Sequence, residues 1–542
     1  MLVQDFLQDS AARTPDKVAL IFQGRRLTYQ EVDAQANRLA QALLDQGVQR
    51  GDRVAIYLPN SVEAVVAIFA VLKAGAVFSV INHTTKLDKL VYILNDCQAT
   101  GLITQARRLR MLEELQDRVP SLKSVVLCGQ EAGKAMEDRM RHSEERSRAC
   151  PEPCPERSRR DSRRKESRFL NEFLAFEALQ QTYPDQLPPQ NCIDVDLACL
   201  IYTSGTTGEP KGVMSAHYNV VAAASSIIQY LENVPEDIVI NVLPLSFDYG
   251  LYQLLMTFKF GGTLVLEKSF AYPAAVLKLM EKEQVTGFPG VPTIFAILLQ
   301  MDLSKYDLSN LRYITNTAAA LPPSHILQLR LKFPWATLYS MYGLTECKRV
   351  SYLPPEELYR RPGSVGIAIP NTEVWIVDED GNRVGPGVVG ELVVRGSHVM
   401  RGYWEKPEET VQRYRPGPIP GERVLYTGDL FKVDEEGFLY FVARKDDIIK
   451  SRGEKVSPKE VENVLYSLDG VVEAAVVGVS DEILSEAIKA FIVRRDDNTL
   501  TERDVLRHCT QHLEDLMVPK YVEFRSELPK TTSGKIKKTD LR

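Results

Sequence analysis

The chain has 542 residues, of which 44% are hydrophobic and 25% are charged, and its formal net charge is -6. This length exceeds one ordinary core and predicts two or more domains, and the mild acidic balance gives no electrostatic case for nucleic acid as the main partner. No apolar run approaches the roughly 18 to 20 residues of a membrane span, and the first residues lack the pattern of a secretory signal, so we expect a cytoplasmic enzyme.

Helical and strand-like patterns alternate in the first hundred residues. Apolar residues recur at helical spacing over 27–47 and 61–75, and short apolar runs over 52–59 and 76–82 are typical of strands. This alternation predicts an α/β fold in which helices flank a mostly parallel sheet.

A different composition interrupts the pattern between about residues 131 and 168. Arginine, serine, glutamate and proline dominate there, and large apolar residues are nearly absent. Such a segment buries too little surface to offset its ordering entropy, so we interpret it as a disordered insertion, with a basic arm for an anionic partner as the alternative. It contains Cys150 and Cys154, whose spacing does not favour zinc, and we expect most of the eight cysteines to be free thiols.

The stretch "YTSGTTGEPKG", residues 202–212, follows a short apolar run and combines glycines, hydroxyl residues and Lys211. Glycines let a backbone approach an anion, and the hydroxyls and the lysine add donors and charge. It lacks the glycine before the lysine and the hydroxyl after it that define the common P-loop. By itself the stretch fits either a phosphate loop or a flexible surface loop.

The α/β alternation resumes at Asp194, and "ATLYSMYGLTE" passes from a strand into a loop. After Pro370, short strands separated by turn residues predict an antiparallel β-rich subdomain. Beyond Lys445, about a hundred residues predict a small α+β domain. We therefore expect an N-terminal domain at 1–445, formed by parallel αβ layers and the β-rich part, and a mobile C-terminal domain at 446–542.

Several stretches in fixed order resemble one family. They are "YTSGTTGEPKG", "LYSMYGLTE", "GELVVRGSHVMRGYW", "YTGDL", "ARKDDIIKSRGEKVSPKEVE" and the closing "LPKTTSGKIKKTDLR". This ordered set resembles the signatures of the adenylate-forming superfamily, which contains acyl-CoA synthetases, adenylation domains of nonribosomal peptide synthetases and luciferases. More finely, "FDYGLYQLL" and neighbouring stretches are similar to bacterial AMP-forming acyl-CoA ligases associated with exosortase systems.

The resemblance implies use of ATP, Mg2+ and coenzyme A or a carrier protein's phosphopantetheine. The expected phosphate contacts come from Thr203, Ser204, Gly205, Thr206, Thr207, Gly208 and Lys211. Glu346 should ligate Mg2+, and Thr345 should donate to the α-phosphate. Outside the motif, Glu346 would be an ordinary solvated carboxylate.

The rest of the nucleotide is assigned in the same way. Asp429 should accept the ribose hydroxyls and Arg444 should contact the ribose, although an isolated Asp429 would be a turn residue. Tyr342 should stack on adenine next to Gly343. The backbone of Ala318 and Ala319 should face the base, with alanines where the family usually has glycines.

The family alternates between two poses of its C-terminal domain, about a hinge that matches Asp446. In the first pose Lys535 should neutralise charge between the carboxylate and the α-phosphate, a role that suits one compact charge on a long stem. In the second pose Lys450 turns inward as a catalytic residue, and Gly453 leaves room for the pantetheine thiol. The alternative for Lys535 is a solvated basic chain end.

The acid substrate is expected to contact Phe247, Asp248 and Asn316. Asp248 fits either a partner for a substrate ammonium group or a helix N-cap. The leading interpretation is an acyl-CoA ligase. The alternatives are a stand-alone enzyme that loads an amino or fatty acid onto an acyl or peptidyl carrier protein in trans, and a non-catalytic paralogue.

Overall fold

The computed structural model describes residues 1–129, 173–204, 209–317, 319, 321–361, 363–451, 454–481, 485–495, 499–531 and 534–541. The insertion predicted at about 131–168 lies outside these residues, as do Cys150 and Cys154. Within the described ranges, Cys97, Cys128, Cys192, Cys199, Cys347 and Cys509 are free thiols.

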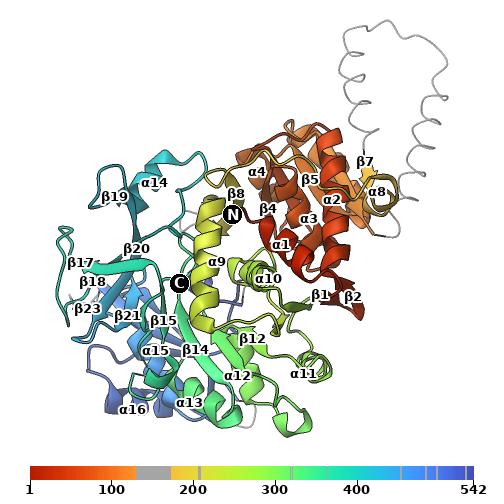
Figure 1. Cartoon of the computed structure of the whole chain (residues 1–542). Helices are drawn as coiled ribbons and strands as arrows, with labels where there is room; N and C mark the ends of the chain where they lie inside the picture. The colour runs from red at the N-terminus through yellow and green to blue at the C-terminus, as the bar shows by residue number, and fades with distance from the viewer. Residues whose placement is uncertain are drawn as a thin grey trace, which may run out of the picture.

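The strands in the described ranges form four sheets, two of them mostly parallel (Figure 1). The first runs, in spatial order, through β16 (Ile367–Ala368), β15 (Ser351–Leu353), β14 (Thr337–Tyr342), β13 (Tyr313–Asn316), β12 (Gly287–Gly290), β10 (Ile238–Asn241), β11 (Thr263–Leu266), β1 (Val18–Phe22) and β2 (Arg25–Thr28). The second runs through β7 (Phe173–Ala175), β6 (Ser124–Cys128), β5 (Gly101–Gln105), β3 (Arg53–Tyr57), β4 (Val77–Val80), β8 (Leu197–Ser204) and β9 (Pro210–Ala216).

The other two sheets are mostly antiparallel. One contains β17 (Thr372–Val377), β18 (Gly390–Gly396), β20 (Arg423–Val433), β19 (Tyr414–Pro416) and β21 (Leu439–Arg444). The other contains β23 (Glu454–Val456), β22 (Ile449–Ser451), β25 (Ser485–Arg494), β24 (Val471–Asp481) and β26 (Tyr521–Phe524). The predicted fold class, α/β layers followed by a β-rich part and a smaller C-terminal α+β unit, is confirmed.

The helices follow the apolar periodicity of the sequence. They are α1 (Asp5–Arg13), α2 (Tyr29–Asp45), α3 (Val62–Lys73), α4 (Leu87–Asp96), α5 (Leu109–Arg118), α8 (Phe176–Thr182), α9 (His217–Leu231), α10 (Asp248–Phe260), α11 (Pro273–Lys282), α12 (Pro292–Leu299), α13 (Pro323–Lys332), α14 (Pro407–Arg413), α15 (Pro458–Ser467) and α16 (Glu502–His512). Short 3-10 turns are η1 (Ala106–Arg108), η3 (Leu303–Lys305), η4 (Pro355–Glu357) and η5 (Lys538–Asp540).

Local signals set the ends of α2. Thr28 and Glu31 form a capping box at its start, since the Thr28 hydroxyl accepts from the Glu31 amide and the Glu31 carboxylate accepts from the Thr28 amide. Gly47 follows the helix with a φ of 82°, a conformation that favours glycine. The expected helix at 27–47 is therefore observed two residues shorter at each end.

Helix α3 shows how the two parallel sheets share one core. Its residues are almost all buried, and the apolar cluster around it includes Val54 of β3 and Leu264 of β11. Lys73 at its end is 1% exposed, and its ammonium lies 2.6 Å from both the Asp33 carboxylate and the Asn37 amide oxygen. This buried cation thus has both an opposite charge and a neutral acceptor within hydrogen-bond distance.

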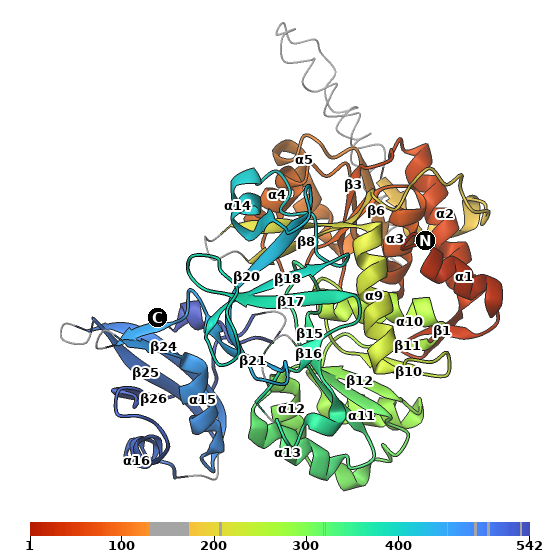
Figure 2. The ribbon, with the colours of Figure 1, turned by 60° about the vertical axis from the view of Figure 1, so that its left-hand side comes forward.

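The last sheet and helices α15 and α16 form a separate layer with their own apolar cluster (Figure 2). The layer touches the rest of the chain through α13, where Ser324 donates to the carbonyl oxygen of Tyr466 at 3.3 Å and the His325 ring lies edge-on to Tyr466. A division of the chain at residues 445 and 446 stays a prediction. In the described part of the chain, no helix is both long and apolar enough to cross a bilayer.

Candidate active site

The predicted phosphate loop joins two strands of an antiparallel hairpin. Thr203 at the end of β8 is the register partner of Lys211 near the start of β9. The Lys211 ammonium lies 5.7 Å from the centre of the Tyr403 ring and 3.9 Å from the Glu409 carboxylate. Gly205, Thr206, Thr207 and Gly208, together with the side chain of Ser204, lie outside the described residues.

A second part of the site lies where β12, β13 and β14 end. Because these strands are parallel, their carboxyl ends share one edge, where Asn316 pairs in register with Gly290 and Ser340. Asn316 donates its side-chain amide to the carbonyl oxygen of Ala319 at 3.1 Å, while its Oδ1 and the Thr317 hydroxyl are buried with no partner within the described ranges. Such atoms need a partner that the described residues do not supply, which water or a ligand can provide. Ala318 lies outside the described residues.

Glu346 follows β14 and is fixed from the neighbouring β-rich part. The Tyr403 hydroxyl donates to Glu346 Oε1 at 2.7 Å, and the Met400 amide donates to the Glu346 carbonyl oxygen at 2.9 Å. Thr345 beside it is partly exposed. Mg2+ prefers oxygen ligands and is commonly held by one or two carboxylates together with substrate phosphates. Glu346 supplies one such carboxylate, and Tyr403, whose hydroxyl it accepts from, also lies near Lys211.

Asp429, Tyr342 and Arg444 form the predicted nucleoside end. The Tyr342 hydroxyl donates to Asp429 Oδ2 at 2.6 Å, and Arg444 Nε lies 3.6 Å from Asp429 Oδ1. The Tyr342 ring packs edge-on to Phe431 at 4.8 Å between centroids. Burial raises the pKa of Asp429, and Arg444 and the Tyr342 hydroxyl oppose that shift by stabilising the ionised form.

This geometry predicts a pH effect of Arg444→Gln. Without the guanidinium the pKa of Asp429 should rise further, so the carboxylate becomes protonated at a higher pH and accepts the ribose hydroxyls less well there. Calorimetry between about pH 4 and pH 8 measures AMP affinity at each pH. As the pH is lowered, the affinity of Arg444→Gln should begin to fall at a higher pH than that of the wild type. Arg444→Lys keeps the positive charge, so the pH at which its AMP affinity falls should shift less. Identical pH profiles for all three proteins would contradict an effect of Arg444 on the pKa of Asp429.

Lys535 reaches the site from the C-terminal layer. A tight turn presents it, in which the Lys535 amide donates to the Thr531 hydroxyl at 3.1 Å and Thr293 of α12 donates to the Gly534 carbonyl oxygen at 3.4 Å. Its ammonium lies 5.6 Å from the centre of the Phe247 ring. Burial lowers the pKa of Lys535, and the carboxylates of Asp248, Asp429 and Glu346 act against that shift. The predicted catalytic lysine is therefore inside the predicted site rather than at a solvated chain end.

The first turn of α10 lines another side of the candidate active site. Phe247 is the N-cap residue, and Asp248 is the first residue of the helix. Asp248 therefore lies at the helix start, as the alternative to an ammonium partner predicted, but one residue after the N-cap position. A carboxylate there is still favoured by the helix dipole. Asp248 is 7% exposed, and its charge acts on Lys535.

Two cations beside Asp248 were missed by the sequence interpretation. Lys348 and Arg349 follow Glu346 after one intervening residue, Cys347, and are 1% and 3% exposed. Burial lowers the pKa of Lys348, and Asp248 opposes this shift more than any other charge. Lys348 has a φ of 63°, and a Cβ on Gly343 would collide with its carbonyl oxygen, so Gly343 is needed for the close approach of this turn.

Tyr403 was also missed, although it lies in the quoted "RGYW" stretch. No local pattern shows that its hydroxyl reaches Glu346, 57 residues earlier in the chain. The remaining predicted residues lie at the start of the C-terminal layer. Asp446 is exposed in the turn between β21 and β22, Lys450 is on β22 with its side chain outside the described residues, and Gly453 lies outside them.

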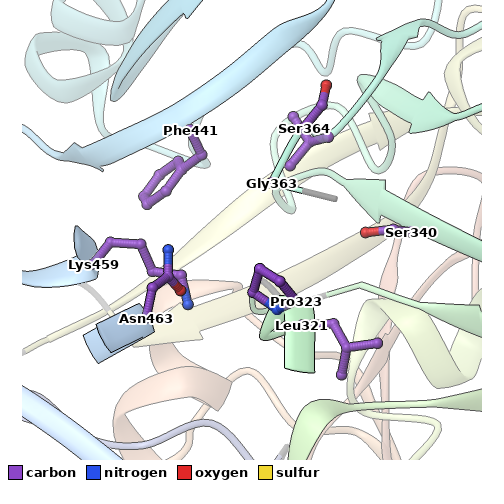
Figure 3. A pocket seen from close by; sticks show the side chains of 9 residues that line it. Leu321, Pro323, Ser340, Gly363, Ser364, Phe441, Lys459 and Asn463 are labelled. Atoms are coloured by element: carbon purple, nitrogen blue, oxygen red, sulfur yellow. The ribbon is translucent and has the colours of Figure 1, made fainter. Parts of the chain in front are cut away.

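A small cavity of about 40 Å³ separates α15 from the edge of this site (Figure 3). Lys459 and Asn463 of α15 face Leu321 and Pro323 across it, and Ser340 of β14 and Phe441 of β21 lie on its other sides. Its volume admits only a few water molecules. The contact between the C-terminal layer and the rest of the chain is therefore partly polar and incompletely packed.

Comparisons with known proteins agree with this geometry. Residues 7–404 match the family described as AMP-binding enzyme, and residues 460–535 match the AMP-binding enzyme C-terminal domain. The chain is 34% identical to a long-chain-fatty-acid--CoA ligase of Bacillus subtilis, over 98% of this chain and 93% of that protein.

Two further similarities are to proteins with other names. The chain is 29% identical to gramicidin S synthase 2 of Brevibacillus brevis, over 98% of this chain and 11% of that protein. Its structure resembles that of the anthranilate CoA ligase AuaEII in complex with anthranoyl-AMP, with a TM-score of 0.86 and 27% identity, covering 100% of this chain and 96% of that one.

Proposed function

This chain belongs to the AMP-binding enzyme family, and from that premise we propose that it activates a carboxylic acid with ATP and transfers the acyl group to the thiol of coenzyme A. A carboxylate oxygen attacks the α-phosphorus of ATP, so that a mixed anhydride, acyl-AMP, forms and pyrophosphate leaves. The thiol then attacks the acyl carbon, and AMP leaves with the electron pair of the broken bond. The observation that carries the proposal is the position of Lys535 over Phe247, within reach of the charges of Asp248, Glu346 and Asp429.

Each half of the nucleotide has a separate set of residues in this proposal. The loop at 203–211 binds the β- and γ-phosphates, which leave together, and Thr345 donates to the α-phosphate. Tyr342, Gly343, Ala318 and Ala319 bind the base, and Asp429 and Arg444 bind the ribose. Mg2+ held by Glu346 would neutralise phosphate charge when bound.

Lys535 has the central role in adenylate formation. As the carboxylate approaches the α-phosphate, negative charge accumulates on both groups, and a cation placed between them lowers the barrier. The position of Lys535 supports assignment of this pose of the C-terminal layer to the first half-reaction. For the second half-reaction we propose rotation about Asp446, which removes Lys535 and brings Lys450 and Gly453 to the thiol.

Coenzyme A as the acceptor is supported by the similarity to a long-chain-fatty-acid--CoA ligase along nearly the whole chain. A second candidate is transfer of an amino or fatty acid to the phosphopantetheine of a carrier protein. It is favoured by the similarity to gramicidin S synthase 2 and by the buried Asp248, which could pair with a substrate ammonium group. Cytoplasmic location and kinship with exosortase-associated ligases stay predictions.

A two-step assay tests these proposals. Exchange of labelled pyrophosphate into ATP is measured first with fatty, aryl, dicarboxylic and amino acids, and the best acid is then offered with coenzyme A or with a phosphopantetheinylated carrier protein. We expect acid-dependent exchange and a thioester of coenzyme A. A thioester on the carrier protein alone would select the second candidate, and absence of exchange with every acid would reject both.

A further inference from the structure

Two buried cations, Lys348 and Arg349, pack on aromatic rings of α10, and the charge of Asp248 at the start of that helix acts on Lys348. The Lys348 ammonium lies 5.5 Å from the centre of the Tyr252 ring, and the Arg349 guanidinium lies 4.6 Å from the centre of the Tyr249 ring. Residues 248–252 rise about 6 Å along the axis of α10. The cluster therefore begins within about one helical turn of Phe247, over which Lys535 lies.

Three donors in this cluster have no acceptor within the described part of the chain. They are the ammonium of Lys348, Nε of Arg349 and the hydroxyl of Tyr252, all buried. A buried donor left unpaired is destabilising because it has lost its hydrogen bonds to water, and the cost is greater when the donor is charged. Several such donors around one carboxylate indicate that an acceptor is supplied by a molecule that binds there.

Among the described residues, Lys73 is the other lysine with almost no exposed surface, and it shows how a structural lysine is held in this protein. Lys73 is as deeply buried as Lys348, yet it has the carboxylate of Asp33 and the amide oxygen of Asn37 at 2.6 Å each. Lys348 has neither a hydrogen bond nor an ion pair within 4.0 Å among the residues described. Burial alone therefore does not account for Lys348.

We propose, on the basis of the proposed function, that the acid substrate carries a second carboxylate, which Lys348, Arg349 and Tyr252 bind while Lys535 faces the carboxylate that reacts. The substrate class is a short dicarboxylic acid, because the cluster begins about one helical turn from the reacting end. A long alkyl chain in this position would leave all three donors unpaired. This distinguishes the chain from the fatty acid ligases that it resembles.

Charge balance favours a plain dicarboxylic acid. Lys348 and Arg349 together carry one more charge than Asp248 neutralises, and one distal carboxylate restores neutrality. An α-amino group on the substrate would pair with Asp248 and leave the cluster cationic again. Amino dicarboxylic acids are therefore the secondary members of the class.

The first experiment compares acids of equal carbon number in the pyrophosphate-exchange assay with the whole chain. Succinate, glutarate and adipate are paired with butanoate, pentanoate and hexanoate, and hexadecanoate, aspartate and glutamate are included. We expect kcat/KM for the diacids to exceed that of their partners by about 10²-fold or more, because a site built around buried donors rejects analogues that lack the acceptor. Faster exchange with aspartate or glutamate would support the distal carboxylate and assign Asp248 to the ammonium.

Variants test the residues. Lys348→Met should bring the ratio between diacid and monoacid close to one, and Tyr252→Phe should lower it about tenfold. Thermal unfolding gives a readout independent of turnover. Without ligand, Lys348→Met should unfold at or above the wild-type temperature since it removes an unpaired buried charge, whereas the matched control Lys73→Met should unfold at a lower temperature. Glutarate should raise the unfolding temperature of the wild type, and Lys348→Met should lose that rise.

The outcomes separate this proposal from the proposed function. Exchange driven best by monocarboxylic acids would leave the ligase intact and overturn the second carboxylate. A fall in the unfolding temperature of Lys348→Met as large as that of Lys73→Met would identify Lys348 as a structural partner of Asp248, and would also overturn it. If no acid drives exchange, the proposed function fails, and stabilisation by glutarate but not pentanoate still decides whether the cluster binds a diacid.

Discussion

Lys535→Ala should reduce acyl-AMP formation by about 10³-fold or more, while the transfer of an acyl group from preformed acyl-AMP to the thiol stays nearly intact. A single cation that stabilises phosphoryl-transfer charge contributes about 10³- to 10⁵-fold. Lys535 lies over Phe247, where the charges of Asp248, Asp429 and Glu346 act on it, so its ammonium is placed at the site. In the proposed second pose it has left the site and no longer affects the rate.

The two half-reactions are measured separately. Pyrophosphate exchange reports the first, and AMP release from synthetic acyl-AMP with the thiol reports the second. Lys537→Ala is the matched control, because Lys537 is an exposed lysine of the same segment and pairs with Asp540 at 2.8 Å. Equal losses in both half-reactions would contradict the division of roles.

Glu346→Gln should lower kcat/KM of acyl-AMP formation by about 10²- to 10³-fold and weaken the dependence of ATP binding on Mg2+. The amide keeps the size of the side chain and can still accept from Tyr403, but it removes the negative charge that favours a divalent cation. Only the phosphate oxygens of the nucleotide would then supply negative charge to the Mg2+ ion.

Calorimetric titration of ATP at several Mg2+ concentrations measures the binding effect without turnover. Glu408→Gln serves as the control, since Glu408 is an exposed carboxylate at the start of α14. Tyr403→Phe removes only the hydroxyl that positions Glu346, so we expect a smaller loss from it. An unchanged Mg2+ dependence in Glu346→Gln would remove Glu346 from the metal site.

Local signals made much of the fold predictable. The capping box of Thr28 and Glu31 and the apolar periodicity behind it predict α2, because helix start signals act over a few residues. The family motifs likewise led to Lys535 and Asp429, which the structure brings into one site with Asp248 and Glu346. Asp248 was likewise predictable as a helix-start residue, but the sequence did not separate the N-cap position from the first helical position, which Asp248 occupies.

Long-range contacts were not accessible in the same way. In sequence, Lys348 and Arg349 look like any exposed basic pair, and only the packing of α10 against the turn after β14 buries them. The contact between Tyr403 and Glu346 joins segments whose distance depends on the whole fold. The role of such residues can be recognised only in the three-dimensional structure, where their polar atoms are either unpaired or paired with a residue far away in sequence.

The turn that begins at Gly343 carries residues assigned to two different properties, the common reaction and the choice of acid. Glu346, assigned to the reaction common to the family, and Lys348, assigned here to the choice of acid, are two residues apart on a backbone that leaves no space for a Cβ at Gly343. Under the proposal made here, substitutions at 348 and 349 should change which acid is accepted while the backbone that holds Glu346 is retained. For protein engineering, this short turn is a natural unit to exchange between relatives, and Gly343 is the position to keep.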